Sequence, residues 1–214
     1  MKEARLTDAI YTIGHSNQSF DSFLSLLCAH QITAIADVRS YPYSSANPQF
    51  DRESFADALH AQDIAYVFLG KELGARTKDS TCYVDGKVQY ELLAKTKLFQ
   101  EGLSRLELGM QRFRVALMCA EAEPLVCHRT ILIARRLRDM QIPVKHILRG
   151  ATVEDHDQSM ERLLRTLEMN NHDMFRDHAA LVSEAYRLQA ERIAYEPPSE
   201  DEKKQCLSAA HKTR

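Results

Sequence analysis

Five short apolar segments, separated by segments with helical spacing, constrain the fold of this chain most strongly. Each apolar segment has the length and the residue types of a buried strand, and the segments between them place apolar residues on one face of a helix. Strands that alternate with helices form parallel sheets with helices on both faces. The sequence therefore predicts an α/β fold, with a parallel or mostly parallel sheet of about five strands and further helices at the C-terminus. The expected strands are residues 10–13, 33–38, 64–69, 113–118 and 143–148.

The 214 residues are enough for one full hydrophobic core and a small appendage. We expect an α/β domain over residues 8–150 and a C-terminal helical extension over residues 151–195, broken near Asn170. Residues 196–214 contain two adjacent prolines, many charges and few apolar residues, which predicts a disordered tail. The long loop over residues 70–87 contains three glycines, and loops of this kind often close over functional sites.

Composition and charge exclude several classes of protein. The chain is 44% hydrophobic and 27% charged, with a formal net charge of −2, so it has no general attraction for nucleic acid. A local basic patch would still bind phosphates. No apolar run approaches the roughly 20 residues of a membrane span, and the first residues do not form a secretory signal peptide. Five cysteines at irregular spacings indicate no disulfide framework, so we expect a cytoplasmic protein that does not bind membranes.

Polar or reactive side chains follow all five predicted strands. In a parallel sheet the carboxyl ends of the strands lie at one edge, and ligands bind outside that edge. The sequence therefore predicts one functional site, built from several separate turns. The residues that reach this edge are His15, Ser16, Asp37, Arg39, Gly70, Glu72, Cys119, Glu121, Cys127, His128, Arg129 and Arg149.

The turn over residues 119–129 carries the densest chemistry: two thiols, two carboxylates, an imidazole and a guanidinium between a strand and a helix. If Pro124 takes the first helical position, Cys127 lies in the first turn, where free N–H groups and the helix dipole stabilise an anion. Arg129 and a protonated His128 would then lower the pKa of this thiol, as in nucleophilic or anion-binding cysteines. An inert buried thiol is the alternative.

The thiols also allow a redox pair or a metal site. The seven residues between Cys119 and Cys127 do not form a recognised redox spacing, and packing is the simpler role for Cys119 at the end of a strand. Cys119, Cys127, His128 and His15 offer the four ligands that Zn²⁺ prefers. Adjacent cysteine and histidine side chains, however, rarely reach the same ion. We therefore predict no metal and no cofactor, and keep zinc as the alternative.

Other candidates also have structural alternatives. His15 is suited to general base catalysis or phosphate binding, and the alternative is a core histidine bonded to the backbone. Asp37 beside Arg39 fits either a catalytic carboxylate or an ion pair that orients the arginine. The phosphatase spacing of a cysteine and an arginine six residues apart is absent, because position 133 is isoleucine. Glycine-rich nucleotide motifs and a serine elbow are absent too.

Four motifs, in this order, resemble the domain-of-unknown-function family four-eighty-eight. The resemblance spans residues 10–149, about two-thirds of the chain. It implies an α/β fold, a cytoplasmic protein of bacterial or archaeal type and a single site formed by the motifs, and it implies no particular reaction. The motifs are Thr12–Asn17; Asp37–Ser40 with Pro42 and Ser44; Leu69–Gly74; and Cys119–Glu121 with Pro124 and Cys127–Arg129.

These residues fit an enzyme best, a hydrolase or transferase with a cysteine in its site. Two arginines favour a small anionic substrate that bears phosphate, and a nucleotide or nucleic acid is the natural candidate. The alternatives are a non-catalytic module that binds the same ligands, and a structural protein that forms a homodimer through its C-terminal helices. The predicted catalytic residues are Cys127, His128, Glu121, His15 and Asp37. The predicted substrate-binding residues are Arg39, Arg129, Ser16, Ser44 and Cys119.

Overall fold

The computed structural model describes residues 9–169 and 177–198. All five predicted strands are present and parallel, so the predicted α/β class is confirmed. The predicted break near Asn170 and the tail from residue 199 onward lie outside the described residues. The parallel strands are β1 (Ile10–Gly14), β2 (Ala34–Asp37), β3 (Ala65–Phe68), β6 (Val115–Cys119) and β7 (Val144–Ile147).

A sixth strand, β8 (Val153–Asp155), pairs antiparallel with β7 and completes the order β3-β2-β6-β1-β7-β8. The helical spacing of the sequence after residue 151 predicts helix in this segment instead. The helix begins only after Asp155, because Asp155 and Gln158 form a capping box that fixes its first turn. The residues before this cap are extended, and they add an antiparallel edge to an otherwise parallel sheet, as is common in such folds.

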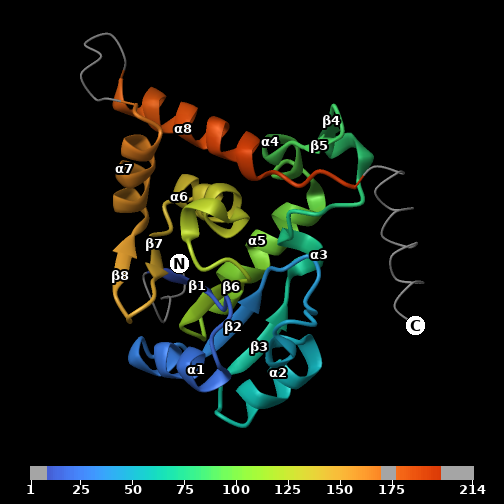
Figure 1. Ribbon diagram of the computed structural model, residues 1–214, viewed down its shortest axis with the longest axis vertical. Helices are drawn as coiled ribbons and strands as arrows, with labels where there is room; N and C mark the ends of the chain where they lie inside the picture. The colour runs from blue at the N-terminus through green and yellow to red at the C-terminus, as the bar shows by residue number, and fades with distance from the viewer. Residues whose placement is uncertain (1–8, 170–176, 199–214) are drawn as a thin grey trace.

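Helices cover both faces of the sheet (Figure 1). On one face, α1 (Phe20–Ala29) and α2 (Arg52–His60) pack their phenylalanines against alternate strand residues such as Ala116 and Met118. The other face carries Val115, Leu117 and Cys119 of the same strand. The helices packed on this second face are α5 (Lys97–Met110), η4 (Arg129–Ala134), α6 (Arg135–Asp139), α7 (His156–Thr166) and α8 (His178–Ile193).

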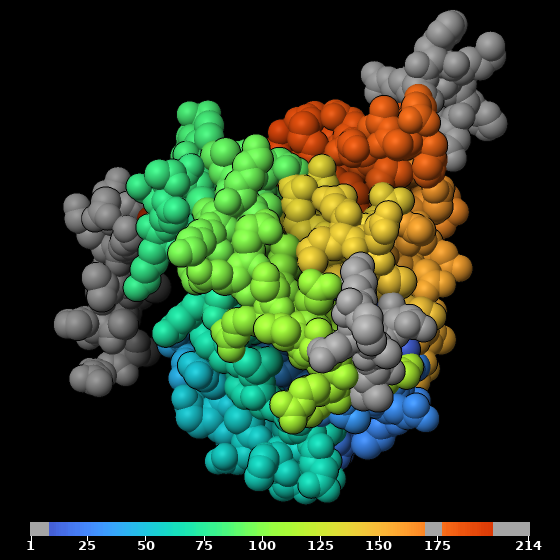
Figure 2. Space-filling model, turned by 180° about the vertical axis from the view of Figure 1, so that it is seen from behind, coloured from blue at the N-terminus to red at the C-terminus, as the bar shows by residue number. Residues whose placement is uncertain are grey.

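The C-terminal helices share one hydrophobic core with the α/β part of the chain. Leu163 and Tyr186 belong to the same buried cluster as Leu117 of β6. The amide of Gln189 donates to the carbonyl of Leu125, 2.7 Å away. Seen from behind in Figure 2, α8 lies along the top of the molecule, with α5 in the middle and the segment of α2 and β3 below. The domain boundary at residue 150 stays a prediction.

The long loop after β3 contains more regular structure than the sequence analysis expected. It holds two short helices and a small hairpin. The apolar spacing over residues 89–108 predicts one helix after this loop, and the structure has two helices there. The division falls at Thr96, whose backbone is extended and whose hydroxyl caps the second helix by accepting from Phe99. The additional elements are α3 (Gly70–Leu73), η2 (Ser80–Cys82), β4 (Tyr83–Val84), β5 (Lys87–Val88) and α4 (Tyr90–Leu93).

The sheet register aligns the turns that carry the candidate residues. Gly14 of β1 pairs with Cys119 of β6, and Asp37 of β2 pairs with Met118. The next hydrogen bond along β1 joins the amide of His15 to the carbonyl of Cys119 at 2.9 Å. Because β6 lies between β1 and β2, the ends of these three strands meet at one edge of the sheet.

Candidate functional site

Four reactive side chains from the turn after β6 converge at this edge. We call Cys119, Glu121, Cys127 and His128 the cluster; one ligand atom from each lies within 4.8 Å of the other three. The imidazole Nδ1 of His128 is 3.7 Å from the Sγ of Cys119 and 3.9 Å from the Sγ of Cys127. The Sγ of Cys127 is also 2.9 Å from Oε2 of Glu121.

The backbone around Cys127 differs from the predicted helical turn. Pro124 begins a separate 3-10 helix, η3 (Pro124–Val126), and Cys127 follows it in an extended conformation with φ −128°. The next helix, η4, has π-helical hydrogen bonding and begins two residues later, at Arg129. The expectation that Cys127 lies in the first helical turn is therefore wrong. The extended residue turns the Cys127 thiol back toward Cys119.

A backbone carbonyl fixes the orientation of His128. Its Nε2 lies 3.0 Å from the carbonyl oxygen of Val38, directly after β2. A carbonyl only accepts hydrogen bonds, so Nε2 carries the proton and donates it. Nδ1 is thereby directed at the two thiols with its lone pair available. The sequence gives no sign of this partner, because Val38 contributes only its backbone.

Burial and mutual contact shift the pKa values of the cluster. The hydrogen bond to Cys127, together with burial, raises the pKa of Cys119 well above its ordinary value. Burial opposes a charge on Cys127, but Cys119, Arg129 and His128 together hold the pKa of Cys127 well below its ordinary value. Burial likewise opposes a charge on His128, yet contact with Cys127 raises its pKa. The cluster therefore stabilises negative charge on sulfur.

Glu121 is the member of the cluster that solvent reaches. Cys119, Cys127 and His128 are at most 8% exposed, whereas Glu121 is exposed as a residue. Its carboxylate nevertheless points inward to Cys127, and burial of that end, with the nearby Cys127, raises the pKa of the carboxyl group. Any ligand that approaches the cluster from outside therefore meets Glu121 first.

Arg129 holds the turn of the cluster rather than facing solvent. Its guanidinium is completely buried and donates to the carbonyls of Glu121 and Ala122, at 2.7 and 3.1 Å. Gly14 permits this arrangement, because a Cβ there would lie 1.8 Å from the carbonyl oxygen of Glu121. The predicted substrate-binding residue Arg129 thus has its donors directed at the backbone.

Asp37 and Arg39 form a buried bidentate ion pair beside the cluster. Nε and Nη2 of Arg39 lie 2.9 and 2.6 Å from the two carboxylate oxygens of Asp37. The hydroxyl of Tyr66 donates to the same carboxylate at 2.8 Å, and the carbonyl of Phe50 accepts from Nη2. Asp37 is therefore placed to orient Arg39, one of the two roles open for it in the sequence. The contribution of Tyr66 was missed, because strand order alone brings β3 next to β2.

His15 lies on the opposite side of Arg39. Its Nδ1 is 2.8 Å from the carbonyl of Ser16, its Nε2 is 3.3 Å from Nη1 of Arg39, and its ring stacks on Phe50. Burial, with a smaller contribution from Arg39, lowers the pKa of His15 to about 4. His15 is therefore neutral at pH 7, with both ring nitrogens engaged outside the cluster.

Two adjoining cavities open above these residues, and we call them together the groove. The first, of about 350 Å³, is lined by Cys119, Glu121 and His128 of the cluster and also by Arg39, Tyr41 and Arg76. Cys127 does not line it. The second cavity, of about 420 Å³, shares Arg39, Tyr41, Tyr43 and Ser44 and extends to His15, Ser16 and Asn17.

The groove carries two exposed rings and one arginine, Arg76, that sequence reasoning missed, and it reaches the predicted Arg149. Tyr41 and Tyr43 are 68% and 39% exposed, and their ring centroids are 5.2 Å apart. The guanidinium of Arg76 lies over the ring of Tyr195, from the segment after α8. Arg149 donates to Ser16 at the far end. The sequence signal for Tyr41 and Tyr43 was their position beside the second motif, in the loop after β2.

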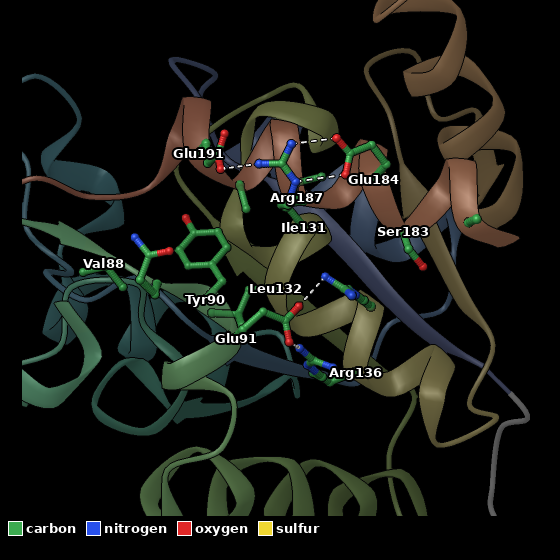
Figure 3. A pocket seen from close by; sticks show the side chains of 14 residues that line it. Val88, Tyr90, Glu91, Ile131, Leu132, Arg136, Ser183, Glu184, Arg187 and Glu191 are labelled. Atoms are coloured by element: carbon green, nitrogen blue, oxygen red, sulfur yellow. Dashed lines mark hydrogen bonds and ion pairs between the residues drawn. The ribbon is translucent and has the colours of Figure 1, made fainter. Parts of the chain in front are cut away.

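A further cavity of about 430 Å³ lies between α4, η4 and α8 (Figure 3), and no member of the cluster lines it. Its charged side chains pair with one another: Arg187 contacts Glu184 and Glu191, and Arg136 contacts Glu91. No cysteine or histidine lines it. This cavity is similar in volume to each cavity of the groove and differs from them in chemistry.

Comparison with known families identifies the chain. The family model described as domain of unknown function DUF488 matches residues 19–136, more than half of the sequence. The chain belongs to this family. No curated protein and no solved structure matches it. The DUF488 match includes the second, third and fourth motifs, while the first, Thr12–Asn17, precedes the matched region.

The family assignment confirms the resemblance found in the sequence, and it assigns no reaction to DUF488 proteins. Over residues 9–169 and 177–198, no helix is both long and apolar enough to cross a membrane. The activity of this family member must therefore be inferred from its site.

Proposed function

We propose that this DUF488 protein is an enzyme that carries out hydrolysis or group transfer on an anionic, phosphate-bearing substrate bound in the groove. The observation that carries the proposal is the groove itself, in which three members of the cluster, Cys119, Glu121 and His128, line the same cavity as Arg39 and Arg76. An anion held by these guanidinium groups would lie in the same cavity as the electron-rich groups of the cluster.

The positive charge of the arginines in the groove, and the fixed orientation of Arg39, support an anionic substrate. Arg39 is only 4% exposed, and Asp37 raises the pKa of its guanidinium although burial opposes the charge. A buried, fully oriented guanidinium loses little conformational entropy when a ligand binds. Arg76 and Arg149 are exposed and add positive charge at the two ends of the groove.

The tyrosines of the groove favour a substrate with an aromatic base. Tyr41 and Tyr43 present exposed rings at the part shared by both cavities, and base stacking on such rings is sequence-tolerant and contributes about 1–3 kcal/mol per base. A nucleotide, or a single-stranded segment of nucleic acid, would place a base there and its phosphate beside the arginines.

A non-catalytic binding module is the second candidate, because the same walls would bind a nucleotide without reacting. The test uses the reduced full-length protein and a panel of mononucleotides, dinucleotides and aryl phosphates, with turnover followed by phosphorus NMR and binding by calorimetry. Cys127→Ser alters the cluster without altering a residue that lines the groove. Cys28→Ser is the matched control, since Cys28 is an exposed thiol on α1.

For an enzyme, we expect Cys127→Ser to lower turnover by at least ~100-fold while the dissociation constant changes by less than about threefold. Cys28→Ser should leave both values unchanged. Saturable binding without turnover in the wild-type protein would support the binding module instead. A wild-type protein that neither binds nor converts any member of the panel would overturn both functions.

A further inference from the structure

The cluster has the donor set and the spacing of a mononuclear metal site. Two sulfurs, one imidazole nitrogen and one carboxylate oxygen lie within 4.8 Å of one another. In tetrahedral zinc sites the metal–sulfur and metal–nitrogen distances place sulfur and nitrogen about 3.6 Å apart. The separations of 3.7 and 3.9 Å between the thiols and Nδ1 of His128 are close to that value.

The surroundings of the cluster orient the ligand atoms as a metal site requires. Histidines that bind a metal usually donate their other ring proton to a carbonyl or carboxylate, which fixes the nitrogen that faces the metal. Val38 supplies this acceptor for His128 at 3.0 Å. Arg129 in turn fixes the backbone of Glu121 through its carbonyl, and Gly14 leaves room for that carbonyl.

Exposure separates the roles of the four groups. Cys127 is 1% exposed and lines no wall of the groove, so a substrate in the groove does not reach its sulfur directly. A buried thiol in this position is poorly placed as a nucleophile but well placed as a ligand. Glu121 is the exposed member, and it is the ligand that water or a substrate oxygen can replace.

We propose that the three buried groups, Cys119, Cys127 and Nδ1 of His128, bind one Zn²⁺. Glu121, the exposed member of the cluster, is the exchangeable fourth ligand. Two thiolates and an imidazole select Zn²⁺ over the hard cations Mg²⁺ and Ca²⁺. The Sγ of Cys127 and Oε2 of Glu121, now 2.9 Å apart, would separate by roughly half an ångström around the metal. His15, the fourth zinc ligand considered from the sequence, is engaged by Ser16 and Arg39.

The catalytic role of this zinc site rests on the proposed function, and the site adds a metal to that function. A zinc ion at this position would polarise a phosphoryl oxygen of a substrate that Arg39 and Arg76 hold in the groove. Binding of the metal can, however, be measured without any substrate. The two proposals can therefore fail separately.

The test is a cobalt titration of the full-length protein after treatment with chelator and thiol reductant. We expect one equivalent of Co²⁺ to give intense sulfur-to-cobalt charge-transfer absorption and the visible bands of tetrahedral cobalt, and stoichiometric Zn²⁺ to remove them. Cys119→Ser and Cys127→Ser should each lower cobalt affinity by at least ~100-fold, whereas Cys28→Ser should bind like wild type. Glu121→Gln should keep the single site and weaken it less than either cysteine substitution.

Folding of each metal-free variant is checked by circular dichroism against the metal-free wild type. The wild-type spectrum itself reports thiolate ligation, so the proposal stays testable if a variant fails to fold. A folded, reduced wild type that binds no cobalt, or that binds it without charge-transfer absorption, would overturn the zinc site. If the chelated wild type still turns over phosphate esters at its full rate, the zinc proposal fails while the proposed function stands.

Discussion

The cavity of Figure 3 is similar in volume to each of the two cavities of the groove, and both places carry arginines and carboxylates, yet their charges are arranged differently. Around the cavity of Figure 3, half-exposed Arg187 lies between Glu184 and Glu191, so charges on the same helix neutralise one another. In the groove, Arg39 is buried, oriented by Asp37, and directed along the edge of the sheet toward His15. Cavity size and charge count are therefore similar in the two places, and the burial and orientation of the charge separate them.

The largest expected effect comes from breaking the buried pair. Asp37→Asn would leave the guanidinium of Arg39 buried without its counter-charge, and it should lower the free energy of unfolding by about 3–5 kcal/mol. Urea denaturation followed by circular dichroism measures this change. A loss below about 1 kcal/mol would mean that the Asp37–Arg39 pair behaves like the exposed ion pairs around the cavity of Figure 3. The burial of Arg39 would then not distinguish the groove from that cavity.

The backbone beneath the cluster provides the next largest effect. Gly14→Ala should cost about 3 kcal/mol, because its Cβ would lie 1.8 Å from the carbonyl of Glu121 and neither backbone can move freely. Gly109→Ala in α5 is the matched control. A Cβ there meets only Val115 at 3.8 Å, so this substitution should stabilise the helix by about 0.5–1 kcal/mol. Thermal unfolding measures the Tm of both variants, and a shift of both Tm values in the same direction would contradict the prediction.

Acid should lower the free energy of unfolding through His156, which joins α7 to β7 and α8. His156 is buried between His146 and Tyr186, at 2.9 and 2.5 Å, and burial lowers its pKa to about 4. The unfolded chain takes up this proton near pH 6.5 and the folded chain only near pH 4, so stability falls as the pH decreases between these values. Its contribution between pH 7 and pH 5 is a loss of about 2 kcal/mol.

Urea midpoints of the wild type at pH 7 and pH 5 measure this loss, and His156→Gln separates the contribution of His156 from those of other groups. The variant should be less stable at pH 7 but should lose less on acidification. His146, whose pKa burial also lowers, contributes with the same sign and remains in the variant. An identical acid-induced loss in the wild type and in His156→Gln would exclude His156 as its source.

The smallest effect is expected at the surface. Arg187→Ala removes ion pairs to Glu184 and Glu191 on the exposed face of helix α8 and should leave the urea midpoint almost unchanged. Raising the salt concentration should reduce even this difference, because exposed charges are screened. If Arg187→Ala lowered the free energy of unfolding as much as Asp37→Asn does, burial would not determine the strength of these ion pairs.

Much of the fold could be predicted from the sequence, because the five buried strands are short apolar runs with helical patterns between them. The candidate residues follow the carboxyl ends of these strands. Because those ends lie at one edge of a parallel sheet, the location of the site could be predicted as well. The strand order could not be predicted. The contacts of Tyr66 with Asp37, and of His128 with Val38, depend on which strands are neighbours, and apolar patterns do not encode this.

The local geometry of the site was harder to predict than its location. The sequence pattern of Pro124 favours a helix start, and it does start one, but that helix ends after one turn and leaves Cys127 extended. This single conformation directs two adjacent side chains, Cys127 and His128, to the same point, which the sequence analysis considered rare. Helical periodicity describes which face of a helix is buried, and it does not report where one short helix stops and the next begins.

The central position of β6 determines when this site can exist during synthesis. β1, β2 and β3 leave the ribosome first. At that stage β1 has neither of its neighbours, β6 and β7, and the β2–β3 pair is not joined to β1. Only β6 fills the space between them, and it ends at Cys119, with the rest of the cluster directly after it. The joining of β1 to the β2–β3 pair and the assembly of the site therefore depend on the same strand, and a chain interrupted before residue 115 has neither.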